Sequence, residues 1–301
     1  MTGGDPQKKV WTILELLQWG TTYLNAKGFD EARLTVELLL AHSLQLSRVQ
    51  LYTNFDRPLR EPELSAFKAL FQRRLRHEPV QYILGRTEFM GLEFEVDRRA
   101  LIPRPETEVV VEQAITHLRE HHSGRESTVL EIGTGSGCIA VSLAKMVEES
   151  RVHAVDISDD ALALAKHNAS KHGVEGRVNF RNLDILSAGT NGFAEKFDLI
   201  ISNPPYISAE EFKKLDAEIR DFEPHAAATD GGDGLVFHRY IAENGRSWLR
   251  DGGLVIVEFA YNQSERATKV FRENGWTECK VVQDYSGVPR CLLALNTGGA
   301  S

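Results

Sequence analysis

Residues 130–137 read Leu-Glu-Ile-Gly-Thr-Gly-Ser-Gly. An apolar run ends there in three alternate glycines, and an apolar segment at helical spacing follows, which predicts a buried strand, a tight turn and a helix. Because glycine has no Cβ, such a turn lets the backbone approach a ligand closely. Cys138 occupies the place of the third glycine of a dinucleotide fingerprint, which disfavours an NAD site. We therefore expect a nucleotide cofactor other than NAD at this turn.

From Thr128 onward, strand-like and helix-like segments alternate around this stretch. The expected strands are short apolar runs rich in β-branched residues: 128–132, 152–155, 178–181, 199–202 and 254–258. The expected helices between most of them are 138–147, 161–171, 235–249 and 264–274. Such alternation predicts an α/β, Rossmann-like fold with a mostly parallel sheet covered on both faces. Residues 276–283 and 290–295, joined by a turn at Ser286-Gly287, predict an antiparallel C-terminal hairpin.

The chain before residue 100 has a different pattern. Apolar residues recur at helical spacing over 10–24, 32–46 and 62–76, which predicts a small N-terminal helical bundle. Over 81–96 the period falls to two, with Gly85 and Gly91 as turn points, which predicts a β-hairpin. We therefore expect three parts, listed by their bounds: a helical domain at 1–78, a β-hairpin linker at 79–100 and the α/β domain at 101–301.

The composition is ordinary for a water-soluble protein. Of 301 residues, 43 are Asp or Glu and 35 are Lys or Arg, which gives a formal net charge of −8. This balance provides no global field that attracts nucleic acid, so we expect no direct nucleic-acid partner. The three cysteines have no metal-ligand spacing, and we expect no metal. The sequence carries no signal or transit pattern and no apolar stretch of bilayer length, so we expect a cytoplasmic monomer without a membrane partner.

Polar residues at expected strand ends are candidates for holding the nucleotide cofactor. Asp156 ends the second strand, where an acid commonly accepts hydrogen bonds from ribose hydroxyls. The alternative is that an acid there only caps the following helix, a role that Ser158 can fill equally well. Asp184 and Ile185 end the third strand and would hold the edge and the face of adenine. Glu131 either reaches an amino group of the cofactor or accepts hydrogen bonds from loop amides.

Asn203-Pro204-Pro205-Tyr206 follows the fourth expected strand. Such prolines mark turns in any case, but this turn would share a crevice with the glycine loop, since ligands bind beyond the carboxyl ends of parallel strands. An amide or exocyclic amino nitrogen is a poor nucleophile because its lone pair is delocalised. The Asn203 side-chain oxygen and the Pro204 backbone carbonyl can accept hydrogen bonds from the two N–H groups of such a nitrogen. Tyr206 offers a flat face against which the planar group can pack. This clamp calls for an activated methyl donor, so we expect S-adenosylmethionine as cofactor and S-adenosylhomocysteine as product.

Further motifs resemble those of one family. They are Ala32-Arg33 with Glu37-Leu38-Leu39, residues 78–85 (Glu-Pro-Val-Gln-Tyr-Ile-Leu-Gly), Phe89 with Gly91, residues 101–108 (Leu-Ile-Pro-Arg-Pro-Glu-Thr-Glu), Glu223-Pro224 and residues 231–235 (Gly-Gly-Asp-Gly-Leu). Together with the Asn203–Tyr206 turn, they make nearly the whole chain resemble the PrmC/HemK family. Members of that family are protein-(glutamine-N5) methyltransferases that modify the Gly-Gly-Gln motif of peptide chain release factors.

The resemblance implies a class I S-adenosylmethionine-dependent methyltransferase domain, with a helical domain that recognises the substrate. By that resemblance, the residues that contact S-adenosylmethionine are Gly133, Thr134, Gly135, Ser136, Gly137, Asp156, Ile185 and Asn203. The residues that hold the substrate glutamine for transfer are Asn203, Pro204, Pro205 and Tyr206. Two positions depart from the family pattern: Ala260 stands where glycine is usual, and Ile185 where some members have an aromatic residue.

Two other functions compete with this interpretation. A DNA or RNA amino-methyltransferase acting on adenine N6 or cytosine N4 faces the same geometric problem as an amide methyltransferase. It would need a flipped base and a basic surface that grips phosphate, and the acidic balance argues against it. A non-catalytic cofactor-binding or ribosome-associated module would not need an intact Asn203–Tyr206 turn. We therefore expect methylation of a release-factor glutamine.

Overall fold

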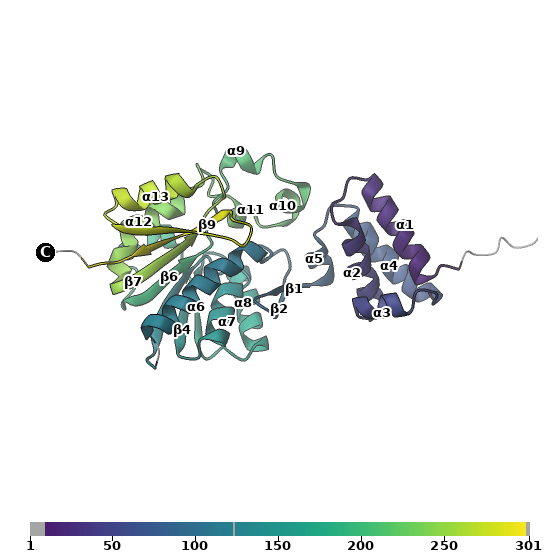
Figure 1. Ribbon diagram of the computed structural model, residues 1–301, viewed down its shortest axis with the longest axis horizontal. Helices are drawn as coiled ribbons and strands as arrows, with labels where there is room; N and C mark the ends of the chain where they lie inside the picture. Colours follow the sequence, from purple (N-terminus) through teal and green to yellow (C-terminus); the bar gives the residue numbers. More distant parts are fainter. Residues whose placement is uncertain (1–9, 123, 299–301) are drawn as a thin grey trace, which may run out of the picture. The chain divides into compact units, whose positions relative to one another are not determined.

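The computed structural model describes residues 10–122 and 124–298. The chain forms two compact units that divide between Gly85 and Arg86. The first unit is helical and the second combines helices with a large sheet (Figure 1). No helix in the described part of the chain combines the length and the apolar character that a bilayer crossing needs.

The first unit confirms the expected helical bundle. Its helices are α1 (Ile13–Ala26), α2 (Ala32–Leu44), α3 (Arg48–Thr53), α4 (Glu61–Arg74) and α5 (Val80–Leu84). Helix α1 begins at a capping box, in which Thr12 Oγ1 accepts a hydrogen bond from the Glu15 backbone N–H and the Glu15 carboxylate accepts one from the Thr12 backbone N–H. Apolar side chains from all five helices form one buried core. Each helix is therefore held by packing within its own unit.

The β-hairpin is shorter than the sequence pattern predicts. Only β1 (Arg86–Phe89) and β2 (Leu92–Glu95) pair with each other, and they belong to the second unit. The expectation of a strand from residue 81 was wrong, because Val80–Leu84 form helix α5. Pro79 starts the helical turn with a φ of −55°, and Gly85 ends it in the left-handed region at a φ of +73°. The helical turn that these two residues start and end forms in spite of the alternating apolar pattern between them.

The second unit is built on a seven-stranded sheet in the order β5-β4-β3-β6-β7-β9-β8. The strands are β3 (Ser127–Ile132), β4 (Ser150–Asp156), β5 (Val178–Asn182), β6 (Phe197–Ser202), β7 (Leu249–Glu258), β8 (Glu278–Gln283) and β9 (Pro289–Leu295). Strands β3 to β7 are parallel, and β9 is antiparallel to both β7 and β8. This confirms the Rossmann-like sheet with its antiparallel hairpin. The strand order reverses at β3, and ligands bind at such a switch point.

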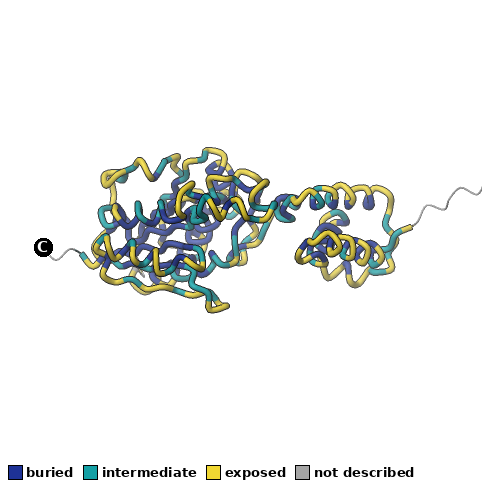
Figure 2. The backbone as a smooth tube through the Cα atoms, turned by 90° about the horizontal axis from the view of Figure 1, so that it is seen from above, coloured by how far each residue is buried: buried dark blue, intermediate teal, exposed yellow. Residues whose placement is uncertain are grey.

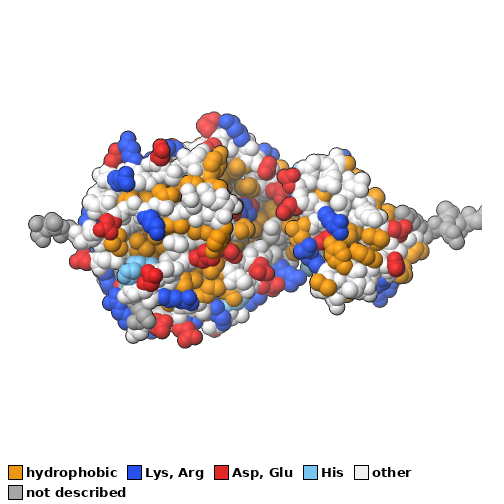
Figure 3. Space-filling model, in the orientation of Figure 1, with side chains coloured by type: hydrophobic (Ala, Val, Ile, Leu, Met, Phe, Trp, Pro, Cys, Tyr) orange, Lys and Arg blue, Asp and Glu red, His pale blue; other side chains and the backbone are white. Residues whose placement is uncertain are grey.

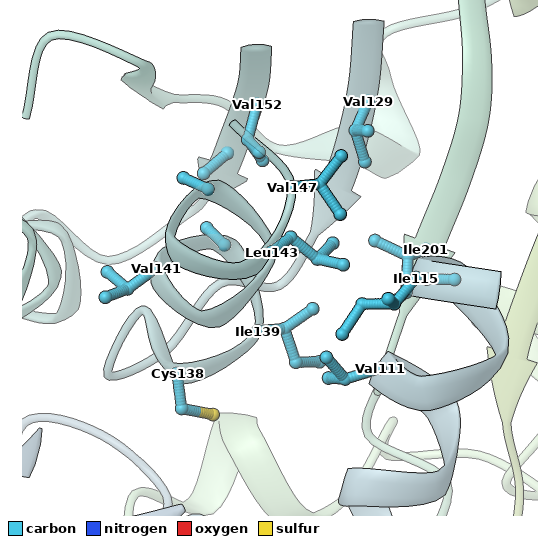
Figure 4. Packing of buried hydrophobic residues seen from close by; sticks show 14 of the residues in the cluster. Val111, Ile115, Val129, Cys138, Ile139, Val141, Leu143, Val147, Val152 and Ile201 are labelled. Carbon is cyan, nitrogen blue, oxygen red and sulfur yellow. The ribbon is translucent and has the colours of Figure 1, made fainter. Parts of the chain in front are cut away.

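Helices cover both faces of this sheet, as expected. One face carries α6 (Glu108–His122), α7 (Cys138–Met146) and α8 (Asp159–Lys171), and the other carries α12 (Val236–Trp248) and α13 (Ser264–Glu273) (Figure 1). Successive side chains of a strand point to opposite faces, so Ile201 packs with α6 and α7 while Ile200 packs with α12. Figure 4 shows Ile139 and Leu143 of α7 directed toward Ile115 and Ile201. Burial is accordingly concentrated along the strands (Figure 2).

The long connection between β6 and α12 contains three short helices that the sequence pattern did not predict. They are α9 (Ala209–Phe212), α10 (Ala217–Phe222) and α11 (His225–Ala228). A single parallel bridge pairs Ile207 with Thr229, and the Ile207 N–H donates to the Ala228 carbonyl at 3.2 Å. The connection therefore returns beside Tyr206 before it enters α12. Two 3₁₀ turns, η1 (Pro105–Thr107) and η2 (Ile185–Ser187), lie near the same edge of the sheet.

Candidate active site

A cavity of about 470 Å³ opens beyond the carboxyl ends of the parallel strands. Its volume lies in the range of roughly 300–1,000 Å³ typical of small-molecule sites. The expected site residues that line it are Gly133, Thr134, Gly135, Ser136, Asp156, Asp184, Ile185, Asn203, Pro204 and Pro205. Gly137 and Tyr206 are the two expected site residues outside this lining. The fold thus brings the glycine loop and the proline-rich turn to one cavity.

The glycine loop is held against the neighbouring strand by its own backbone. The N–H groups of Gly133 and Thr134 both donate to the Val155 carbonyl, at 2.9 and 3.1 Å. Gly137 has a φ of +81°, and a Cβ built there would lie 3.0 Å from the Ala165 Cβ of α8. Gly137 therefore allows α7 and α8 to pack closely, and a contact between it and a cofactor stays a prediction.

Asp156 fastens the glycine loop and still faces the cavity. Its Oδ2 accepts a hydrogen bond from the Gly135 N–H at 2.9 Å, and its Oδ1 accepts one from the Ser158 N–H at 3.0 Å. Helix α8 is capped by Ser158, whose hydroxyl accepts from the Ala161 N–H, so Asp156 is not the cap of that helix. A carboxylate offers about four acceptor positions, so two remain for hydroxyl groups of a ligand. These two free acceptor positions fit the two hydroxyl groups of a ribose diol.

Asp184 and Ile185 begin the turn that follows β5. Asp184 Oδ1 accepts from the Leu186 N–H at 3.0 Å, and its Oδ2 accepts from the Ser187 hydroxyl at 2.7 Å, so the carboxylate caps η2. Ile185 is buried, and both residues line the cavity. The position suits the edge and face of a base, and their contact with adenine stays a prediction.

Glu131 is a buried acid beneath the glycine loop. The Thr134 hydroxyl donates to its Oε2 at 2.6 Å, while no described residue donates to its Oε1. Burial raises the pKa of Glu131 to about 8; the Thr134 hydroxyl opposes that rise and the nearby charge of Asp156 adds to it. The acid therefore accepts a hydrogen bond from a hydroxyl of the glycine loop, and it lies outside the lining of the cavity.

The proline-rich turn begins at the end of the fully buried strand β6. The Ser202 hydroxyl donates to the Ile132 carbonyl at 2.8 Å, which ties the end of β6 to the end of β3. The next side chain, Asn203, donates through Nδ2 to the Thr107 hydroxyl oxygen at 3.0 Å. One of the two Nδ2 hydrogens is thereby engaged, and Oδ1 is the group of this side chain that can accept a hydrogen bond from a bound nitrogen.

The far end of the turn is fastened at Tyr206. Its hydroxyl donates to Glu258 Oε1 at 3.2 Å, and its backbone carbonyl accepts from Gln263 Nε2 at 2.8 Å. Gly234 packs so tightly against the same carbonyl that a Cβ there would overlap it. Burial raises the pKa of the Tyr206 hydroxyl, and the neighbouring Glu258 charge adds to the rise. Both ends of the turn are therefore fixed by side chains outside it.

An ion pair joins two further walls of the cavity. Arg104, from the stretch before α6, contacts buried Glu223 at 2.5 Å, and Arg104 also lines the cavity. Burial raises the pKa of Glu223, and the Arg104 charge opposes that rise. The Arg98 guanidinium lies 4.6 Å from the Phe222 ring centre, which adds a second contact between the same segments. The segment after Tyr206 is thus held as a wall of the cavity.

Comparisons with known proteins agree with this geometry. A family model described as the PrmC N-terminal domain matches residues 15–85, and one described as a methyltransferase domain matches residues 123–282. The release factor glutamine methyltransferase of Geobacter sulfurreducens is 43% identical over 94% of this chain and 96% of its own length. That of Chlorobaculum tepidum is 42% identical over 96% of this chain and 99% of its own length. This chain belongs to the release factor glutamine methyltransferase family.

A solved structure supports the fold of the family's larger domain. The human methyltransferase 10 domain containing protein has a TM-score of 0.50 and 16% sequence identity, and the match covers 69% of this chain and 90% of that one. At that identity the likeness shows the fold alone. The resemblance to the PrmC/HemK family inferred from the motifs is therefore confirmed by the sequence relatives.

Four residues of this family member hold the proline-rich turn and were not singled out from the sequence. They are Thr107, Gly234, Glu258 and Gln263. Thr107 and Gly234 lie in motifs that carried the family resemblance, but nothing in those motifs says that they meet Asn203 or Tyr206. Glu258 is an acid at a strand end, like Asp156, and that position was a usable signal.

Proposed function

We propose that this protein transfers a methyl group from S-adenosylmethionine to the side-chain amide nitrogen, N5, of the glutamine in the Gly-Gly-Gln motif of a peptide chain release factor. The observation that carries this proposal is the shared cavity: Asn203, Pro204 and Pro205 line it together with the glycine loop and Asp156. The name borne by the full-length relatives supplies the substrate. Because release factors work with ribosomes, we place the enzyme in the cytoplasm, and we propose that it acts as a monomer.

The chain's own groups fit the two halves of this reaction. S-adenosylmethionine, when bound, would supply a methyl group from a sulfonium that departs as a neutral thioether, and the methylated amide nitrogen would lose one of its two protons to water. The two open acceptor positions of Asp156 would hold its ribose hydroxyls, with Asp184 and Ile185 near its base. Asn203 Oδ1 and the Pro204 carbonyl would each accept a hydrogen bond from one of the two N–H groups of the glutamine amide. Fixing the nitrogen in this way can lower the barrier by up to about 7–11 kcal/mol in ideal cases.

We also propose roles for the parts of the chain outside the cavity. The helical domain at 1–78 would recognise the release factor, and residues 79–100 would link it to the methyltransferase domain at 101–301. The match of residues 15–85 to the PrmC N-terminal domain supports this division of labour. Tyr206 would pack its ring beside the planar amide, since its hydroxyl is already bound to Glu258.

A nucleic-acid amino-methyltransferase is the weaker candidate. Such an enzyme grips phosphate with a basic surface, and its binding weakens steeply with salt. The net charge is −8, and Lys and Arg side chains lie interspersed with Asp and Glu over the described part of the face drawn in Figure 3. That distribution favours a protein substrate.

Labelled methyl donor distinguishes the two candidates. The protein is incubated with the donor and equal amounts of purified release factor and total RNA and DNA, followed by separate protease and nuclease digestion. We expect label that protease releases and nuclease does not, at low and at moderate salt. Label confined to nucleic acid would contradict the proposal, and so would label in neither fraction.

Replacing Asp156 by alanine tests the cofactor half of the site. We expect S-adenosylmethionine to bind at least about tenfold more weakly, since each hydrogen bond to a charged group contributes about 1.5–3 kcal/mol. Titration calorimetry measures the change. Asp159→Ala is the matched control, because Asp159 lies three residues away, bonds Asn182 and does not line the cavity. Unchanged affinity in Asp156→Ala would remove Asp156 from the site.

A further inference from the structure

Glu258, at the end of β7, is a buried acid directly beneath the proline-rich turn. Its side chain is 1% exposed, and its backbone carbonyl accepts a hydrogen bond from His238 Nε2 at 2.8 Å. The Tyr206 hydroxyl donates to Oε1, while Oε2 is buried with no fixed donor among the described residues. The Thr107 hydroxyl lies beside this carboxyl group and favours its ionised form.

Thr107 connects this acid to Asn203. Its hydroxyl oxygen accepts the hydrogen bond from Asn203 Nδ2 at 3.0 Å. A hydroxyl has one hydrogen to donate, and that hydrogen rotates to suit the available acceptor. The Thr107 hydroxyl interacts with the Glu258 carboxyl group, whose Oε2 has no other donor among the described residues. The result is a directed chain in which Asn203 donates to Thr107 and Thr107 donates to Glu258.

The direction of this chain matters because a carboxamide can present either of its ends. An ionised carboxylate only accepts hydrogen bonds, so the Thr107 hydrogen is committed to Glu258 and the Thr107 oxygen must accept from Asn203. Asn203 then turns its NH₂ group toward Thr107 and its Oδ1 toward the cavity. Without a committed acceptor, the Thr107 hydroxyl is free to donate to Asn203 Oδ1. The amide is then free to turn over and present NH₂ to the substrate nitrogen, which also carries hydrogens.

We propose that Glu258, acting through Thr107, is a positioning residue that sets which end of the Asn203 amide faces the substrate. This inference rests on the proposed function, because Oδ1 must face the cavity only if the nitrogen that receives the methyl group carries N–H groups that donate hydrogen bonds. It assigns no contact between Glu258 and the substrate. It explains why an acid is kept in a fully buried position where an apolar side chain would be less costly.

Glu258 should change its protonation state within the pH range over which turnover can be measured. Burial raises the pKa of Glu258 to about 7, while the Thr107 and Tyr206 hydroxyls and the Arg290 charge oppose the rise. The titratable groups that surround it are Tyr206, Arg290, Glu106, His238, Cys291 and Cys138. Burial lowers the pKa of His238 to about 4, so this histidine is neutral around pH 7. Turnover should therefore rise as pH increases through about 7, since the ionised carboxylate is the form that directs the chain.

The first test removes the relay hydroxyl and leaves the shape of the side chain. Thr107→Val should lower kcat for release-factor methylation at least about tenfold and change KM for the methyl donor by no more than about twofold. Thr107→Ser restores the hydroxyl and should restore kcat to within about threefold. Thr128→Val is the matched control, because Thr128 is buried at the opposite end of β3 from the cavity, donates to Asp198 of β6 and does not line the cavity. It should leave kcat unchanged.

The second test titrates the acid. Glu258→Gln should lower the plateau of kcat and abolish the rise of turnover through about pH 7. The folded-state pKa of Glu258 lies above its ordinary value of 4.5, so this acid lowers the stability of the fold as pH rises from about 4.5 to about 7, and the whole loss is present above that range. The Gln variant should accordingly be no less stable than the wild type at pH 8. Thermal unfolding checks this and separates lost positioning from lost structure.

The outcomes separate this inference from the proposed function. A wild type that puts no methyl group on a release factor overturns the proposed function, and the inference with it. An active wild type whose Thr107→Val variant keeps kcat within about twofold overturns the inference alone. So does a Thr107→Ser variant that fails to recover, or a Glu258→Gln variant that is folded and keeps the wild-type pH profile.

Discussion

Asn203→Ala should lower the turnover of release-factor methylation by about 100- to 1,000-fold, equivalent to about 2.7–4 kcal/mol of transition-state stabilisation. The substitution removes Oδ1, which is held toward the cavity because Nδ2 is bound to the Thr107 hydroxyl. An acceptor fixed before the reaction needs no reorganisation, which is why losing it has such a large effect. Single-turnover assays with saturating methyl donor measure the change.

A loss of fold must be distinguished from a loss of catalysis in this variant. Asn203 is only partly buried and its side chain makes one hydrogen bond among the described residues, so the unfolding midpoint should change little. The Thr128→Val protein again serves as a folded reference with normal turnover. Turnover of Asn203→Ala within a few-fold of the wild type would mean that the turn does not orient the substrate nitrogen.

Gly234→Ala should both destabilise the protein and disable it. Gly234 has a φ of +83°, and a Cβ there would overlap the Tyr206 carbonyl oxygen and Gln263 Nε2. The left-handed conformation costs an alanine about 1–2 kcal/mol, and the overlap adds about 1–3 kcal/mol. Relief of the overlap must displace the Tyr206 end of the turn. A displacement of about 1 Å in a reacting group can lower the rate about 100-fold.

Gly231→Ala is the matched control for this substitution. Gly231 lies in the same loop with a φ of +71°, but no atom lies within 4 Å of a Cβ built there. The Gly231→Ala variant should have the strain of the left-handed backbone without any overlap, and its turnover should stay near normal. Denaturant unfolding and methylation assays on both variants separate the two effects. Equal stability and equal turnover in the two variants would show that the contact with Tyr206 has no consequence.

The sequence was informative wherever local pattern decides structure. The strand that ends at Ile132, the glycine turn after it and the strand that ends at Ser202 are each predicted by apolar runs and turn residues within a few positions. Since the carboxyl ends of parallel strands meet at one edge, the sequence also predicted that the two turns share a cavity. Helices α3, α5 and α9 to α11 were missed because they are too short to show helical periodicity.

The supports of the turn were beyond sequence reasoning for a different reason. Thr107, Gly234, Glu258 and Gln263 come from four segments, and only the folded sheet places them around the turn. Each has an ordinary structural explanation when read alone. Their shared role is a property of the tertiary contacts, which a single sequence does not display.

Peptide mass spectrometry of a release factor treated with this protein and S-adenosylmethionine tests the central claim most directly. A release factor purified from cells that lack such an enzyme is the substrate, and Asn203→Ala protein is the parallel control. The account predicts one added methyl group on the glutamine of the Gly-Gly-Gln peptide, located at its side-chain amide nitrogen, and little or none with the variant. A methyl group on any other residue, or an unmodified Gly-Gly-Gln peptide after treatment with folded wild-type protein, would contradict it.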